Sequence, residues 1–147
     1  VAGIVGIILG GISGGVIISR YGLRRSFWPL VVCMHAPNLL YVWAAYTHPP
    51  TWTMYGVAFV DQFGYGFGFT AYSLFMIMVS EGEHKTVHYA IGTGIMALGM
   101  MIPAMLSGWI QEQLGYSHFF LWILLSTIPG FIVAAMIRID PAFGKGE

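Results

Sequence analysis

Charged side chains are scarce in this sequence, because Asp, Glu, Lys and Arg make up only 8% of its 147 residues. Soluble domains carry about 25%, so an ordinary soluble globular domain is excluded. The formal net charge is zero, and no basic or acidic excess points to a nucleic acid as a partner. The one cysteine, Cys33, excludes a framework of internal disulfides.

The sequence also lacks the features of a complete N-terminus. It begins with Val1 rather than Met, and no basic leader or cleavage site precedes its first apolar run. We therefore expect it to be a part of a longer or processed protein.

Apolar residues are abundant, at 57% of the sequence, and the mean hydropathy is +0.75. They form runs near or above the length of about 20 residues that a helix needs to cross a bilayer. These runs do not alternate apolar and polar residues, as the strands of a membrane barrel do. We predict an all-α polytopic membrane protein with five transmembrane helices, at residues 1–19, 27–46, 52–80, 87–111 and 119–139. Pro37 is expected to kink the second helix.

The basic residues are confined to three places: the first connection, the third connection and the C-terminal segment. They are Arg20, Arg24, Arg25, Lys85, Arg138 and Lys145. The second and fourth connections have none. With five spans, the three basic places lie on one side of the membrane, which the positive-inside rule makes the cytoplasmic side. The C-terminus is therefore expected to be cytoplasmic.

Glycines recur every three or four residues in the first run, at Gly3, Gly6, Gly10 and Gly14. Small residues at this spacing share one helix face and let another helix approach closely. Close packing is one interpretation of this face. The alternative is a sliding surface on which one helix rocks against another.

Asp61 is the one formal charge well inside a predicted span. It follows Trp52 by nine residues, or about 13 Å of helix, which places it near the middle of the bilayer. A buried carboxylate costs several kcal/mol unless it is paired, hydrated or protonated, and such residues usually serve a pathway. Its roles would be proton acceptance or contact with a polar substrate, and the alternative is a structural bond to a neighbouring helix. Glycines 64, 66 and 68 are expected to loosen the helix beside it.

Three further polar residues join Asp61 in the predicted substrate and proton pathway, namely Gln62, Tyr65 and Thr93. His84 and His88 are four residues apart, but without the Glu placement of a protease motif they indicate a solvated loop. We predict no metal site and no cofactor. A membrane enzyme would need two or more ionisable residues that converge inside the spans, and Asp61 has no such companion.

The first connection resembles the loop signature of the major facilitator superfamily, G-x-x-x-D-R-x-G-R-R, at Gly15, Arg20, Gly22, Arg24 and Arg25. Ser19 takes the place of the usual Asp, and Leu23 separates the glycine from the arginine pair. The resemblance implies a twelve-helix transporter in which the five runs correspond to helices eight to twelve. Helix seven and the N-terminal half would lie outside this sequence. The five signature residues would form a cytoplasmic gate, although Ser19 weakens a latch made through a carboxylate.

Residues 64–131 also look like the AmpG-type muropeptide permeases. The similar pieces are GFGFTA at 66–71, KTVHYA at 85–90, SGW at 107–109, LGYSHFF at 114–120 and PG at 129–130. The resemblance implies proton symport of anhydro-sugar peptides across the bacterial inner membrane by alternating access. The partners would be a small-molecule substrate, protons, the bilayer and the missing half. A drug or metabolite exporter or facilitator of the same fold, and a membrane scaffold or sensor subunit, remain alternatives.

Overall fold

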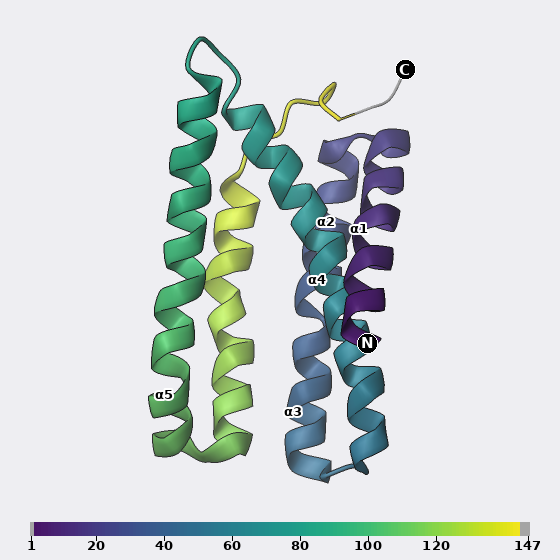
Figure 1. Ribbon diagram of the computed structural model, residues 1–147, viewed down its shortest axis with the longest axis vertical. Coiled ribbons are helices and arrows are strands. Elements are labelled where there is room, and N and C mark those ends of the chain that lie inside the picture. The colour runs from purple at the N-terminus through teal and green to yellow at the C-terminus, as the bar shows by residue number, and fades with distance from the viewer. Residues whose placement is uncertain (1, 145–147) are drawn as a thin grey trace.

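The computed structural model describes residues 2–144, and within this range the chain is helical and has no strand. The helices are α1 (Ala2–Tyr21), α2 (Leu23–His35), α3 (Pro37–Thr47), α4 (Thr51–Val79) and α5 (Lys85–Met136). Two ends of the molecule are distinguished in Figure 1. The α1–α2 turn, the α4–α5 loop and the chain after α5 lie at one end, and the α3–α4 connection lies at the other.

The predicted second span, residues 27–46, is a helix that is interrupted once. α2 ends at His35, and α3 begins at Pro37, with Ala36 between them. The N–H of Ala36 still donates to the carbonyl of Val32 at 2.8 Å, whereas Pro37 has no N–H to donate. The chain therefore continues in one direction through a local break, which confirms the kink expected at Pro37.

The long helix α5 consists of two antiparallel parts joined at Gly115. This residue has φ 71° and ψ 165°, a conformation that is essentially restricted to glycine. Figure 1 shows the chain reversing there, at the end opposite the α4–α5 loop. The parts before and after Gly115, residues 85–114 and 116–136, overlap the predicted spans 87–111 and 119–139.

Among the residues that the structure describes, three helical stretches are long and apolar enough to cross a membrane. They are Ala2–Tyr21, Leu23–Thr47, which joins α2 to α3, and Lys85–Met136. The all-α fold class is therefore confirmed, and the chain has the helix lengths and hydropathy of a multi-pass membrane protein.

The glycines of α1 lie against α4, as the packing interpretation predicts. Gly6, Gly10 and Gly14 are all buried. A Cβ on Gly6 would be 2.6 Å from the carbonyl oxygen of Phe59, and one on Gly14 would be 2.9 Å from that of Phe67. Real Cβ atoms almost never approach this closely, so the two backbones meet at a distance that only glycine permits.

The glycines of α4 do not loosen their helix, so that expectation is wrong. α4 is continuous from Thr51 to Val79. Gly64 faces the carbonyl of Cys33 on α2, Gly66 faces the carbonyl of Ile7 on α1, and Gly68 faces the side chain of Met34. Each glycine permits a close contact with a neighbouring helix, and α4 is therefore packed tightly against both α1 and α2.

The most deeply buried apolar residues gather at the end of the molecule that carries the α1–α2 turn. They are Ile18, Leu23, Phe27, Leu30, Phe67, Ala71 and Ala134. The segment after α5 folds back over this cluster, where the N–H of Leu23 donates to the carbonyl of Phe143 at 3.0 Å. By contrast, Ala134 is the one buried residue of α5. The tight core thus involves α1, α2 and α4, and α5 packs more openly beside it.

Candidate functional site

Asp61 lies on α4 and is partly buried. The side-chain amide of Gln62 donates to its Oδ2 at 3.2 Å. The phenol of Tyr41, on α3, lies close to the same carboxylate. The carboxylate thus has a hydrogen-bond partner on its own helix and a phenol close by on a neighbouring helix.

Tyr41 is a site residue that the sequence analysis missed. Proximity between side chains of two helices depends on how the helices pack, which a single sequence does not give. One local pattern in the sequence indicates the direction of Tyr41. It follows Pro37 by four residues, so the two residues share one face of α3. That face meets α4, because Pro37 is buried close to Gly64.

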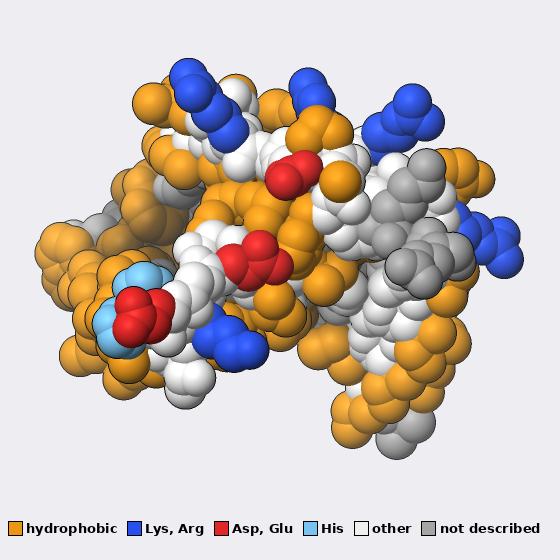
Figure 2. Space-filling view, turned by 90° about the horizontal axis from the view of Figure 1, so that it is seen from above, with side chains coloured by type: hydrophobic (Ala, Val, Ile, Leu, Met, Phe, Trp, Pro, Cys, Tyr) orange, Lys and Arg blue, Asp and Glu red, His pale blue; other side chains and the backbone are white. Residues whose placement is uncertain are grey.

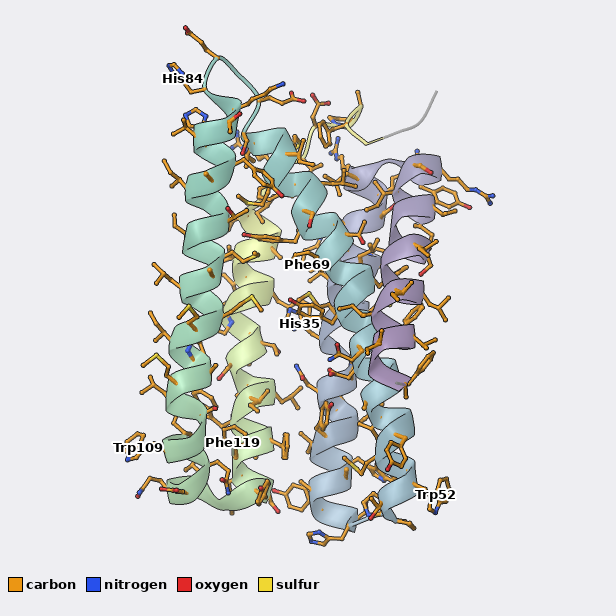
Figure 3. The ribbon with its side chains drawn as sticks, in the orientation of Figure 1. His35, Trp52, Phe69, His84, Trp109 and Phe119 are labelled. Carbon is orange, nitrogen blue, oxygen red and sulfur yellow. The ribbon has the colours of Figure 1, made fainter. Side chains whose placement is uncertain are left out.

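A row of aromatic side chains continues from Asp61 along the same face of α4. Tyr65, Phe69 and Tyr72, which we call the aromatic strip, follow Asp61 at spacings that share one helix face. The rings of Tyr65 and Phe69 have centroids 5.7 Å apart, and those of Phe69 and Tyr72 are 6.3 Å apart. Figure 3 shows Phe69 on the side of α4 that faces α5.

Thr93 lies apart from this group. Its hydroxyl donates to the carbonyls of Tyr89 and Ala90 in its own helix, at 3.0 Å each. Asp61 is about 27 Å of helix from the Val79 end of α4, while Thr93 is about 12 Å from the start of α5 at that end. The structure therefore brings Asp61, Gln62 and Tyr65 together. Thr93 lies about 15 Å nearer the end of the molecule that carries the α4–α5 loop and the α1–α2 turn.

The loop with the superfamily signature forms the turn between α1 and α2. Gly22 makes this turn at φ 80° and ψ 157°, a conformation that other residues rarely adopt. Gly15 lies about two turns earlier in α1 with open space around it, and the hydroxyl of Ser19 donates to the carbonyl of Val16 at 2.9 Å. The glycine at position 22 is therefore required by the backbone.

The arginines of this turn are exposed and surround a hollow of about 530 Å³. Its lining residues are Arg20, Tyr21, Arg24, Arg25 and Pro141. None of its lining residues in the described part of the chain is acidic. Figure 2, which views the molecule from this end, shows Lys and Arg side chains mostly around the outer edge of the molecule. The structure thus gathers the predicted gate arginines at one place and gives that place a positive charge.

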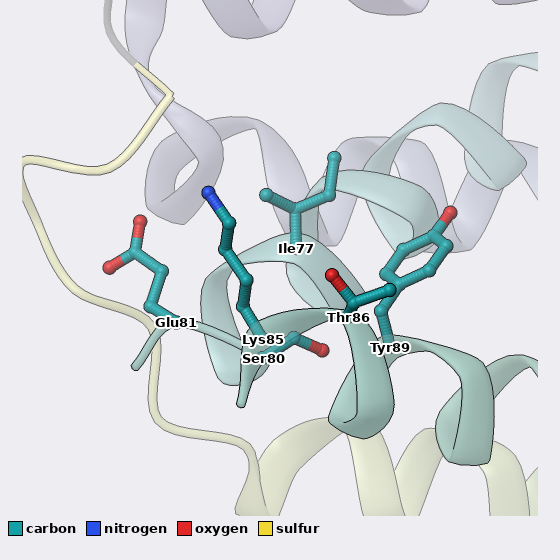
Figure 4. Close-up of a pocket in the computed structure, with 6 residues that line it drawn as sticks. All are labelled: Ile77, Ser80, Glu81, Lys85, Thr86 and Tyr89. Carbon is teal, nitrogen blue, oxygen red and sulfur yellow. The ribbon is translucent and has the colours of Figure 1, made fainter. Parts of the chain in front are cut away.

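A second hollow, of about 380 Å³, lies at the α4–α5 loop (Figure 4). Its lining residues are Ile77, Ser80, Glu81, Lys85, Thr86 and Tyr89. It combines a carboxylate with an ammonium group, so it favours neither sign of charge. Within residues 2–144, no group of three or more His, Cys, Asp or Glu side chains could hold a metal ion. His84 lies at the outer tip of the loop in Figure 3.

Comparison with known proteins found similarity along most of the chain. This chain is 23% identical over 136 residues to the putative transporter AmpG 1 of Rickettsia conorii. The aligned residues cover 92% of this chain and 33% of the relative. It is 23% identical to the anhydromuropeptide permease of Escherichia coli K12, over 92% of this chain and 28% of the relative. An uncharacterized protein of Haemophilus influenzae is 27% identical, over 85% of this chain and 31% of the relative.

The chain thus spans about a third of the length of the curated relatives it matches. No family model matches it, and no solved structure does. Within these bounds, the predicted resemblance is confirmed: the chain is similar, over nine-tenths of its length, to AmpG-type permeases.

Proposed function

We propose that this chain forms the C-terminal part of a twelve-helix major facilitator transporter. The five membrane crossings would be α1, α2 with α3, α4, and the two parts of α5 on either side of Gly115. Two observations support this assignment. The helices overlap the five apolar runs, and the relatives are about three times as long as the chain.

The complete protein would carry a polar solute across the bacterial inner membrane by alternating access, driven by a proton gradient. An anhydromuropeptide or a sugar-like solute is the proposed substrate, because a relative from Escherichia coli K12 is named anhydromuropeptide permease. The observation that carries the proposal is the carboxylate of Asp61. It is the one formal charge between Arg25 and Glu81, and it lies partly buried beside the aromatic strip.

In this proposal Asp61 takes up the proton. A neutral carboxylic acid costs far less than a carboxylate in an apolar layer, so protonation lowers the barrier to closing the surrounding helices. Gln62 and Tyr41 orient the group, and the strip offers flat apolar surface next to hydrogen-bonding groups, as a solute site requires. Thr93 would contact the substrate nearer the basic end.

The end that bears Arg20, Arg24 and Arg25 would face the cytoplasm, because basic residues collect on that side of bacterial membrane proteins. There the arginines would form the cytoplasmic gate. Gly15 and Gly22 would shape the turn that carries them. The C-terminus would be cytoplasmic for the same reason.

The test is uptake of a labelled anhydromuropeptide by liposomes that contain the complete transporter, with and without an inward proton gradient. Asp61→Asn removes the titratable group and preserves the size of the side chain. Glu112→Gln is the matched control, because Glu112 is an exposed acidic residue near the Gly115 turn. We expect gradient-driven uptake that Asp61→Asn abolishes and Glu112→Gln leaves intact.

Other outcomes separate the alternatives. Gradient-driven uptake that survives Asp61→Asn would keep the transporter and refute the proton role of Asp61. Transport in the outward direction alone would favour an exporter. The absence of any flux from folded protein would contradict this substrate, and indifference to every solute tested would favour a scaffold or sensor.

A further inference from the structure

Two hollows on the outer side of α2 join into one site. The first, of about 350 Å³, lies near the α1–α2 turn and includes Arg24, Phe27, Trp28, Ala134, Arg138 and Ile139. The second, of about 500 Å³, runs between α2, α4 and the last part of α5. Phe27, Ala134 and Ile137 line both, so they are continuous. We call the first the basic hollow and the second the apolar groove.

The basic hollow carries two positive charges from distant parts of the sequence. Arg24 is in the first turn of α2, and Arg138 follows the end of α5. Both side chains are exposed, and among residues 2–144 no acidic residue lines the hollow. The nearest carboxylate in the sequence, Asp140, accepts a hydrogen bond from the N–H of Ala142 in its own turn at 2.9 Å. The two guanidinium groups are therefore available to an anion.

The apolar groove continues from this hollow along α2, from Phe27 to His35, which is about 12 Å of helix. Gly68 and Ala71 of α4 give it a floor of small residues, and Pro129 and Gly130 lie on its α5 side. Its lining is almost wholly apolar. A molecule that fills both hollows must have an anionic group at one end and a hydrocarbon chain at the other.

We propose that this continuous site binds an anionic phospholipid of the surrounding bilayer. The phosphate binds Arg24 and Arg138, since guanidinium groups match phosphate oxygens in charge and geometry. One acyl chain lies in the apolar groove. Trp28, at the edge of the basic hollow, lies at the depth where tryptophan meets the headgroup region. Basic pockets between transmembrane helices bind anionic headgroups in this way.

The charge of the site selects the class of lipid. A zwitterionic headgroup would bring its own ammonium group next to two arginines, with no carboxylate in the lining to receive it. A net negative headgroup has no such penalty. The bound lipid would also join α2 to the segment after α5, because one phosphate contacts both arginines. Tyr72, the last residue of the aromatic strip, also lines the apolar groove, so the acyl chain would border the proposed solute surface. This inference concerns lipid binding and does not depend on which solute is transported.

The test is native mass spectrometry of the complete protein in detergent, titrated with phosphatidylglycerol or with phosphatidylcholine of the same acyl chains. We expect one tightly bound phosphatidylglycerol that phosphatidylcholine does not displace. Arg24→Gln and Arg138→Gln should each weaken this binding about fivefold, and the double variant about 25-fold. Lys85→Gln is the control, since it removes one positive charge from the same end of the molecule outside the hollow.

A second variant tests the groove. Gly130→Leu adds a side chain where a Cβ would meet nothing within 4 Å, so the fold tolerates it while the groove is filled. It should weaken phosphatidylglycerol binding and leave thermal stability in detergent unchanged. Equal binding of both lipids, an equal loss in Lys85→Gln, or unchanged binding in Gly130→Leu would each overturn the proposal.

Discussion

Replacing Gly10 by alanine tests whether glycine holds α1 against α4. In the structure, a Cβ at this position would be 2.9 Å from the carbonyl carbon of Phe63 and 2.9 Å from the backbone nitrogen of Phe67, and closer still to the Phe63 carbonyl oxygen. These are backbone atoms of a continuous helix, so they cannot rotate away from an added methyl group. α1 and α4 must therefore move apart.

The cost follows from this geometry. Ordinary van der Waals contact begins near 3.4 Å, so the two contacts at 2.9 Å alone require the backbones to separate by about 0.5 Å, and the closer Phe63 carbonyl oxygen requires more. Overpacking of this kind costs about 1–3 kcal/mol, and contact with rigid backbone places Gly10→Ala at the upper end. Alanine returns about 1 kcal/mol through its better helix propensity. The net loss is about 2 kcal/mol, or roughly a 30-fold increase in the unfolding constant.

Gly56→Ala is the matched control. Gly56 is in α4, and a Cβ there would meet nothing within 4 Å, so this variant should gain propensity without a clash. Unfolding of the complete protein in detergent, followed by circular dichroism, measures both. If Gly10→Ala and Gly56→Ala unfold at the same temperature, close glycine packing does not hold α1 to α4, and the reasoning fails.

Three further changes test other parts of the structure. Tyr41→Phe should lower proton-driven uptake about tenfold by removing the hydroxyl group close to the Asp61 carboxylate, whereas Tyr46→Phe on the exposed face of α3 should not; equal uptake would remove Tyr41 from the pathway. Gly115→Ala should lower stability by about 1–3 kcal/mol through its positive φ, measured against Gly108→Ala. Leu23→Ala should cost about 2–5 kcal/mol in chemical unfolding, since Leu23 is 0% exposed, and a smaller loss would contradict its place in the core.

The helices could be predicted from the sequence because their signal is local. Hydropathy alone outlines the runs at 27–46 and 119–139, and the few basic residues fall in two of the connections and at the C-terminal end. The glycines of α1 repeat at a spacing that only a helix face explains, and their burial follows from it. Each of these features depends on residues within a few turns of one another.

The glycines of α4 and the partner of Asp61 could not be predicted in the same way. Helix propensity treats Gly64, Gly66 and Gly68 as weak points, but each faces a neighbouring helix whose position no local pattern reveals. Tyr41 is 20 residues before Asp61, across the α3–α4 connection, and comes close to it only after α3 packs on α4. Contacts between helices determine both the role of these glycines and the position of Tyr41 beside Asp61.

The packing of α4 limits where chemistry is possible. Gly66 places one side of the helix against α1, and Gly64 places another against α2, both at distances that exclude any side chain. The face left between them carries Asp61 and the aromatic strip, and it is turned toward α5, whose residues pack most openly. A helix fixed so closely on two sides has little freedom to move by itself. We therefore expect α1, α2 and α4 to move as one body and α5 to shift against them, opening and closing the one face of α4 that bears a charge.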